Sequence, residues 1–186
     1  MDFTGKRVLV VGTGVSGIAA IRLLAAKGAK PVVLEGSEKA DREQVVSRIP
    51  EGIGYDLIIG NLPEEVMDTL DLAVLSPGVP TDLPFVIKLQ DKKIPVWGEI
   101  ELAYACGSGR LVAITGTNGK TTTTALTGAI LREYYDSVFV VGNIGLPYTE
   151  YALEMKDSSV TVAEVSSFQL ETIHTFQPEV SAILNI

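Results

Sequence analysis

The chain has 186 residues, of which 46% are hydrophobic and 20% are charged. This composition is typical of a globular protein and excludes disordered and fibrous classes, and the length allows one large domain or two small ones. The net charge of −8 argues against a protein that binds nucleic acid by neutralising phosphates. A single cysteine, Cys106, and a single histidine, His174, exclude an internal disulfide framework and a His-rich zinc site.

The N-terminus lacks the basic-then-apolar order of a signal peptide. No apolar run reaches the roughly 18 residues that a membrane helix needs. We therefore expect a cytoplasmic protein without nucleic-acid or membrane partners.

In the first part of the chain, short β-branched runs alternate with longer helical stretches, which predicts an α/β fold with parallel strands joined by helices. We expect strands at residues 7–11, 31–34, 72–75 and 94–96, and helices at 15–27, 81–90 and 98–105.

A small, flexible, polar run at residues 106–109 separates this block from a second one. We therefore predict two domains, residues 1–105 and 106–186. In the second domain we expect strands at 111–115, 138–141, 160–165 and 180–184, and a helix at 119–134. Both domains open with a strand, a glycine-rich turn and a helix, which directs backbone N–H groups and the positive end of a helix dipole at an anion.

The first glycine-rich turn, GTGVSG at residues 12–17, matches the dinucleotide fingerprint GxGxxG. Glu35 follows at the end of the second strand, where a carboxylate can hold a ribose hydroxyl, so the pattern alone suggests NAD. The glycines could instead serve only a tight turn and close helix packing. A bound diphosphate is the better interpretation, but the turn does not identify it.

The second turn, ITGTNGKT at residues 114–121, has the parts of a loop that binds a nucleoside triphosphate. Gly116 and Gly119 let the backbone surround the phosphates, Lys120 supplies a positive charge, and the Thr121 hydroxyl can ligate Mg²⁺. The turn departs from GxxxxGK[ST] because Ile114 replaces the first glycine. The alternative is a chance Gly-Lys-Thr at the start of a helix, with the lysine only solvated.

Two further polar residues follow strands of the second domain. Glu164 ends the strand at 160–165, where a carboxylate can hold Mg²⁺ or simply pair with a lysine. Asn143 ends the strand at 138–141, and it could be only a turn residue.

The segments ITGTNGKTT (114–122), GNIG (142–145) and AEVSSFQLE (163–171), in this order and spacing, resemble the muramyl ligase family. The resemblance covers essentially the whole chain. The segment at 166–171 favours the D-glutamate-adding member over other muramyl ligases and folylpolyglutamate synthase. An NAD-dependent oxidoreductase is a more distant alternative, because it would leave GTNGKT without a role.

The resemblance implies a Rossmann-like first domain that binds a UDP-sugar. The residues carried over to that ligand are Gly14, Val15, Ser16, Gly17, Glu35, Ser76, Pro77, Gly78, Asn143 and Ser166. Gly36 and Ser37 stand where the family has a threonine and an arginine, so uracil contacts are not carried over there.

The resemblance further implies that the second domain is the first part of a P-loop-type ATPase domain with a mainly parallel sheet. The residues carried over to ATP are Gly116, Thr117, Asn118, Gly119, Lys120, Thr121 and Thr122. Thr121 and Glu164 would hold Mg²⁺, and the catalytic set would be Lys120, Asn143 and Glu164.

The implied reaction belongs to peptidoglycan synthesis. ATP phosphorylates the carboxylate of UDP-N-acetylmuramoyl-L-alanine, and the amino group of D-glutamate attacks the acyl phosphate. In the family, a histidine metal ligand, a carbamylated lysine and a third domain follow the segment present here. We therefore expect an N-terminal fragment, inactive alone and prone to self-association through an exposed sheet edge, and a monomeric full-length enzyme.

Overall fold

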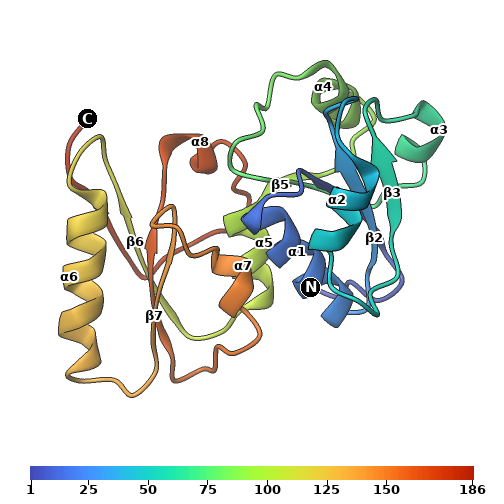
Figure 1. Ribbon diagram of the computed structural model, residues 1–186. Coiled ribbons are helices and arrows are strands. Elements are labelled where there is room, and N and C mark those ends of the chain that lie inside the picture. The colour runs from blue at the N-terminus through green and yellow to red at the C-terminus, as the bar shows by residue number, and fades with distance from the viewer. The chain divides into compact units, whose positions relative to one another are not determined.

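The computed structural model describes all residues, 1–186, and divides into two compact units. The first unit comprises Met1–Glu99 and the second Ile100–Ile186. Figure 1 shows that each unit is built on its own β-sheet with helices beside it. No helix is long and apolar enough to cross a membrane.

The first unit is a five-stranded parallel sheet in the order β3-β2-β1-β4-β5. Its strands are β1 (Arg7–Val11), β2 (Lys30–Glu35), β3 (Asp56–Ile59), β4 (Leu72–Leu75) and β5 (Val96–Gly98). Its helices are α1 (Val15–Ala26), α2 (Arg42–Arg48), α3 (Glu64–Met67) and α4 (Pro84–Asp91). The strand order reverses its direction between β1 and β4, and ligands of open α/β sheets bind at such a point.

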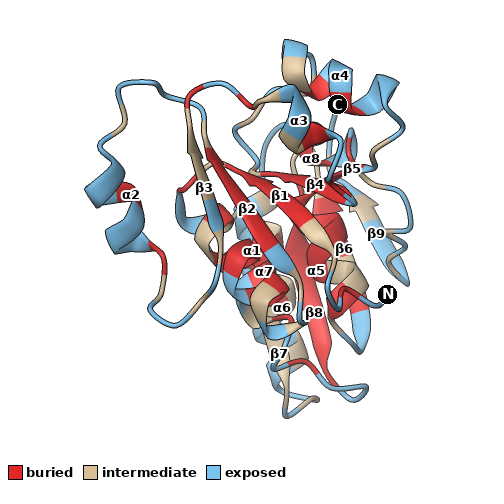
Figure 2. Cartoon of the chain, turned by 90° about the vertical axis from the view of Figure 1, so that its right-hand side faces the viewer, coloured by how far each residue is buried: buried red, intermediate tan, exposed pale blue.

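The core of the first unit lies along β1, β2 and β4, which Figure 2 shows largely in the red of buried residues. Every residue of β4 is buried, as is every residue of β1 after Arg7. Strands covered on both faces need near-continuous apolar runs, which RVLVV and LAVL supply. One face is closed by a cluster that includes Leu9, Leu75 and Leu89.

The second unit is a four-stranded parallel sheet in the order β7-β8-β6-β9. Its strands are β6 (Arg110–Thr115), β7 (Val138–Gly142), β8 (Val160–Glu164) and β9 (Val180–Ile183). Its helices are α5 (Glu99–Cys106, which begins at the last residue of the first unit), α6 (Lys120–Arg132), α7 (Tyr148–Tyr151) and α8 (Ser167–Leu170). Strand β8 is buried throughout, whereas the edge strand β9 is mostly exposed (Figure 2).

Helix α5 is attached to the second unit by a buried carboxylate. Glu101, fully buried, accepts hydrogen bonds from the backbone N–H groups of His174 (2.9 Å), Thr175 (2.7 Å) and Phe176 (3.0 Å), and from the Thr175 hydroxyl (2.6 Å). Burial raises the pKa of the Glu101 carboxyl, but these hydrogen bonds outweigh burial and hold the pKa below its usual value. Ile100 and Ala103 pack in the apolar core of the same unit.

The prediction of an α/β fold with parallel sheets is confirmed, and β1 and β4 have the predicted bounds. The structure divides at 99/100, whereas the sequence analysis placed the boundary at 105/106. The difference arises because α5 packs with the second unit through Glu101 and its apolar neighbours, a contact that local composition does not reveal. The sequence analysis also missed β3, α2, α3, α7 and α8.

Candidate functional site

The glycine loop, residues 12–17, joins β1 to α1, and its glycines have different functions. Gly12 has a φ of +95°, a left-handed conformation that favours glycine. A Cβ on Gly17 would lie 1.9 Å from the carbonyl oxygen of Gly12, so glycine is required there for α1 to approach the loop. A Cβ on Gly14, in contrast, would meet nothing within 4 Å. Gly14 caps α1 without a side-chain hydrogen bond, which leaves the first N–H groups of α1 for an anion.

Ser76 brings the turn after β4 to the glycine loop. A Cβ on Gly12 would lie 3.0 Å from the Ser76 Oγ, and that Oγ is buried without a hydrogen-bond partner. Pro77 and Gly78 follow at the exposed surface. The structure therefore places the predicted 76–78 turn and the predicted glycine loop side by side, at the point where the strand order reverses.

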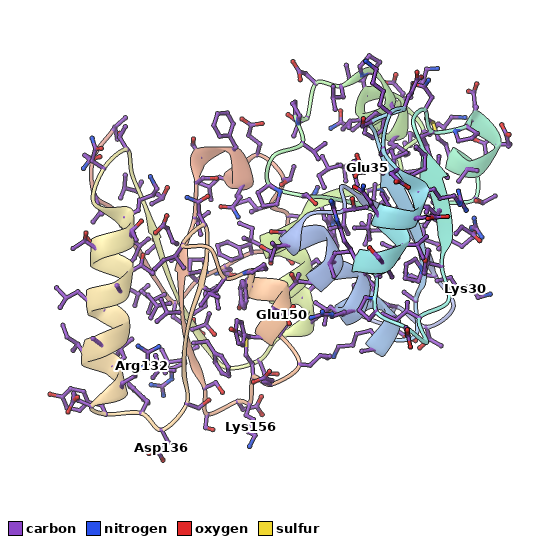
Figure 3. All side chains as sticks on the ribbon, in the orientation of Figure 1. Lys30, Glu35, Arg132, Asp136, Glu150 and Lys156 are labelled. Atoms are coloured by element: carbon purple, nitrogen blue, oxygen red, sulfur yellow. The ribbon has the colours of Figure 1, made fainter.

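Glu35 lies at the carboxyl end of β2, opposite to Lys30 at the other end of the strand (Figure 3). One of its carboxylate oxygens accepts from the Thr13 hydroxyl at 2.5 Å, and the other accepts from the Ser37 N–H at 3.3 Å. The carboxylate thus ties the glycine loop to the loop after β2. Both oxygens retain lone pairs that a ligand hydroxyl could use.

A cavity of about 610 Å³ opens beside these residues, within the first unit. Glu35 and Gly78 line the cavity, whereas Gly14, Val15, Ser16 and Gly17 stand at the start of α1 outside the lining. Lys88 of α4 is the only cationic side chain of the lining. The sequence analysis missed Lys88, because its position on the α4 surface gives no local signal.

In the second unit, the lysine loop (residues 115–121) joins β6 to α6. Gly116 and Gly119 have φ values of +143° and +82°, so both require the freedom of glycine. The Lys120 Nζ folds back and donates to the carbonyl oxygens of Gly116 (2.7 Å) and Thr117 (3.2 Å). The predicted ATP residues therefore form one compact turn with the lysine charge over its carbonyl groups.

The start of α6 is open to an anion. Gly119 caps the helix without a side-chain hydrogen bond, and the first turn contains no acidic residue. Thr121 and Thr122 are exposed there. Free N–H groups and the positive end of the helix dipole favour negative charge at this position.

Glu164 and Asn143 meet at the adjoining ends of β8 and β7. The Asn143 N–H donates to the Glu164 carbonyl oxygen at 2.9 Å, and its side-chain Nδ2 donates to the Glu164 Oε1 at 3.0 Å. Glu164 is 1% exposed, and its Oε2 is buried without a partner. No three His, Cys, Asp or Glu residues of the chain lie together as a ready metal cluster.

Ser166 is occupied locally. It begins α8 with a capping box, in which the Gln169 N–H donates to the Ser166 Oγ at 3.3 Å and the Ser166 N–H donates to the Gln169 Oε1 at 2.9 Å. The Ser166 hydroxyl also donates to the same Gln169 oxygen. Ser166 is therefore the one residue predicted to contact the UDP-sugar whose side chain forms a helix cap.

Comparison with known proteins now identifies the family. The domain described as "Mur ligase MurD-like, N-terminal domain" matches residues 6–98, which is half of the chain. The chain belongs to the Mur ligase family. The "Mur ligase middle domain" matches residues 114–186, so the glycine loop and the lysine loop fall in two successive Mur ligase domains.

Similar curated proteins carry one name. The Mur ligase chain is 55% identical over 186 residues to the UDP-N-acetylmuramoylalanine–D-glutamate ligase of Lachnoclostridium phytofermentans, and 53% identical to that of Lachnospira eligens. All of this chain is matched, but it spans only 41% of the length of each relative. Among solved structures, a murein peptide ligase of Psychrobacter arcticus is 18% identical, with a TM-score of 0.49, over 87% of this chain and 37% of that one.

Proposed function

We propose that this chain is the nucleotide-binding part of an ATP-dependent ligase that adds D-glutamate to UDP-N-acetylmuramoyl-L-alanine. The observation that carries the proposal is the buried, unpartnered Oε2 of Glu164 in the unit that also holds the lysine loop. A buried carboxylate oxygen is costly unless a hydrogen-bond donor or a cation satisfies it, and no donor of this chain reaches the Glu164 Oε2. The names of the relatives, at 55% and 53% identity over the whole chain, supply the substrates.

In the proposed reaction, a carboxylate oxygen of UDP-N-acetylmuramoyl-L-alanine attacks the γ-phosphorus of ATP, and ADP leaves. The amino group of D-glutamate then attacks the acyl carbon, an amide bond forms, and phosphate leaves with the displaced oxygen. Lys120 would move from the carbonyl oxygens of Gly116 and Thr117 to the phosphates, where its charge opposes the negative charge that develops. Because ATP is a cytoplasmic substrate, we place the reaction in the cytoplasm.

The residues at the end of β8 fit a magnesium ion. Glu164 offers a free carboxylate oxygen, Asn143 lies against the other oxygen of the same carboxylate, and Thr121 offers a hydroxyl at the start of α6. Hard oxygen ligands of this kind suit Mg²⁺, which keeps several waters and binds phosphate oxygens. When bound, the ion would neutralise phosphate charge.

The first unit would hold the UDP-sugar. The uncapped start of α1 at Gly14, Val15 and Ser16 would receive the diphosphate. The adjoining cavity, lined by Glu35, Gly78 and Lys88, would receive a further part of the same ligand.

The first test is thermal stabilisation of the 186-residue chain by UDP-N-acetylmuramoyl-L-alanine, NAD and Mg²⁺–ATP in parallel. A ligand at one hundred times its Kd adds about 2.7 kcal/mol to the folded state. We expect stabilisation by the UDP-sugar and by Mg²⁺–ATP, and none by NAD. Stabilisation by NAD alone would replace the ligase with an oxidoreductase.

The second test measures ligation. These 186 residues replace the aligned segment of the Lachnoclostridium phytofermentans relative, and the chimeric protein is supplied with ATP, the UDP-sugar and D-glutamate. We expect ATP-dependent formation of the D-glutamate amide by the chimera and none by the 186-residue chain. A chimera that folds, binds ATP and forms no amide with D-glutamate would contradict the proposed acceptor.

A further inference from the structure

Asn185, which follows β9, makes three side-chain hydrogen bonds to the lysine loop. Its Oδ1 accepts from the N–H groups of Thr117 and Asn118, both at 2.9 Å, and its Nδ2 donates to the Asn118 carbonyl oxygen at 3.0 Å. The side-chain amide of Asn185 therefore bonds to the backbone N–H and carbonyl groups of Asn118 and to the backbone N–H of Thr117.

The backbone around Asn185 supports the same loop. The Leu184 N–H donates to the Thr115 carbonyl oxygen at 2.9 Å, which continues the pairing of β9 with β6. A Cβ on Gly116 would lie 3.2 Å from both the N and the O of Asn185. The first half of the lysine loop thus rests on residues 184–185, and Gly116 permits that close approach.

We propose that Asn185 is a positioning residue for phosphate binding, which holds residues 117–118 in place so that Lys120 and the start of α6 can receive the phosphates of ATP. The inference rests on the proposed function of the lysine loop. Asn185 fixes the Thr117 N–H and both polar groups of Asn118, and Lys120 in turn bonds to the carbonyl oxygens of Gly116 and Thr117. The open N–H groups of the first turn of α6 are left for the ligand.

The Asn185 side chain could either position the loop or merely occupy the place of a phosphate. The hydrogen bond that its Nδ2 donates distinguishes these two functions. A side chain that merely occupied the place of a phosphate would offer an acceptor to converging N–H groups, as an anion does. Asn185 also donates to the Asn118 carbonyl oxygen, and a fully ionised phosphate has no proton with which to replace that bond. The amide is therefore matched to the loop backbone and stays in place when ATP binds.

The expected effect of removing the amide is confined to the loop. Thr117 and Asn118 are exposed, so in an Asn185→Ala chain water can satisfy the Asn118 N–H, while the Thr117 N–H keeps only its longer bond (3.3 Å) to the backbone carbonyl oxygen of residue 185. Fold stability then changes little, but binding must order the backbone of these residues. Ordering one residue is unfavourable enough to weaken binding of Mg²⁺–ATP about tenfold.

The experiment compares the unsubstituted chain with Asn185→Ala and with Ser181→Ala, a control on an exposed position of β9. Calorimetric titration with Mg²⁺–ATP and with UDP-N-acetylmuramoyl-L-alanine gives both affinities, and hydrogen exchange follows the amides of 117 and 118. We expect Asn185→Ala to raise the Kd of Mg²⁺–ATP about tenfold, to speed exchange of the two amides, and to leave the UDP-sugar affinity unchanged. Ser181→Ala should match the unsubstituted chain.

Other results would overturn the inference. Unchanged or tighter ATP binding by Asn185→Ala would show that the amide does not position the loop, or that it competes with phosphate. Faster exchange throughout the second unit would show a general structural function instead. An unsubstituted chain that does not bind Mg²⁺–ATP would remove the proposed function of the lysine loop, and the inference with it, whereas normal ATP binding by both chains removes the inference alone.

Discussion

The two units differ in how they use buried polar groups. Of the ten buried polar or charged side chains, only Thr13 and Glu99 belong to the first unit, and the other eight belong to the second. The first unit closes its loop by backbone contact, with α1 approaching the glycine loop at Gly17, and one side-chain hydrogen bond, from the Thr13 hydroxyl to Glu35, adds to this contact. The second unit holds its loops by side-chain hydrogen bonds, from Asn185 to the lysine loop and from Glu101 to residues 174–176. The close backbone contact at Gly17 is therefore the main constraint on the glycine loop, whereas the lysine loop depends mainly on side-chain hydrogen bonds.

This difference determines which substitutions each unit tolerates. A close backbone contact has no flexible partner that can move, so added volume is the damaging change in the first unit. A buried hydrogen-bonded group cannot lose its partner cheaply, so loss of a polar atom damages the fold of the second unit where the group is buried, as at Glu101. At the exposed Asn185 the loss affects the lysine loop and not the stability of the unit.

The largest expected effect is on catalysis and concerns the lysine loop. Lys120→Ala in the chimeric ligase should lower kcat/KM for ATP about 1000-fold, because a preorganised charge at the transferring phosphate is lost. Lys156→Ala, an exposed lysine of the same unit, is the matched control and should leave kcat/KM unchanged. Affinity of Lys120→Ala for the UDP-sugar should be unaltered, and full ligation without Lys120 would contradict the assigned function of the loop.

The next largest effect is on stability and concerns the glycine loop. Gly17→Ala places a methyl group 1.9 Å from the Gly12 carbonyl oxygen, and α1 must shift. We expect the free energy of unfolding of the first unit to fall by about 3 kcal/mol, as measured by urea titration of the fluorescence of Trp97, which lies in that unit.

Gly14→Ala is the matched control for Gly17→Ala, because its methyl group would meet no atom within 4 Å. Its unfolding free energy should fall by less than about 1 kcal/mol. If Gly14→Ala nevertheless weakens binding of the UDP-sugar, the open space beside Gly14 belongs to the ligand. Equal destabilisation by the two substitutions would contradict the comparison of the two loops.

The fold could be predicted from sequence where the residues of a single strand form a continuous apolar run. Strands β1 and β4 are continuous apolar runs because sheet and helices bury them on both faces, and their predicted bounds are confirmed. Strand β3 is only partly buried at the sheet edge, and Val45 is the only buried residue of α2. Such elements are stabilised by neighbours rather than by their own periodicity, so local pattern did not reveal them.

The site was predictable where a residue follows a strand in a recognisable motif. Lys120 was placed at the start of a helix and Glu164 at the end of a strand, and the structure has them there. Asn185 and Glu101 were missed, because their partners lie 67 or more residues away and meet them only after the chain folds. Polar anchors between distant segments have no local signature, so sequence reasoning does not find them.

A smaller effect tests polar anchoring away from the loop. Glu101→Gln places an amide NH₂ against backbone N–H donors, and the free energy of unfolding of the second unit should fall by about 2 kcal/mol at pH 7. Hydrogen exchange of the amides of α5 measures this loss. The exposed Glu154→Gln is the control, and it should change nothing.

The same carboxylate predicts a pH dependence. The pKa of Glu101 is lower in the folded chain than its ordinary value of 4.5, so folding favours the ionised form. Its stabilisation is fully present above pH 4.5 and is lost as the pH falls through the lower folded value. The difference in stability between the unsubstituted chain and Glu101→Gln should therefore shrink in this acidic range, and a difference that stays constant with pH would contradict the ionised anchor.

The smallest effect separates anchoring from ligand binding at Ser166. Ser166→Ala removes the cap of α8 and should cost about 1 kcal/mol, seen as faster hydrogen exchange of the Gln169 amide. Ser167→Ala, at the exposed next position, is the control and should leave that amide protected. Because the Ser166 hydroxyl is engaged by Gln169, affinity for the UDP-sugar should stay unchanged. If the affinity of Ser166→Ala for the UDP-sugar falls while the Gln169 amide stays protected, the Ser166 hydroxyl contacts the ligand instead of capping α8. The second unit then contributes a substrate contact.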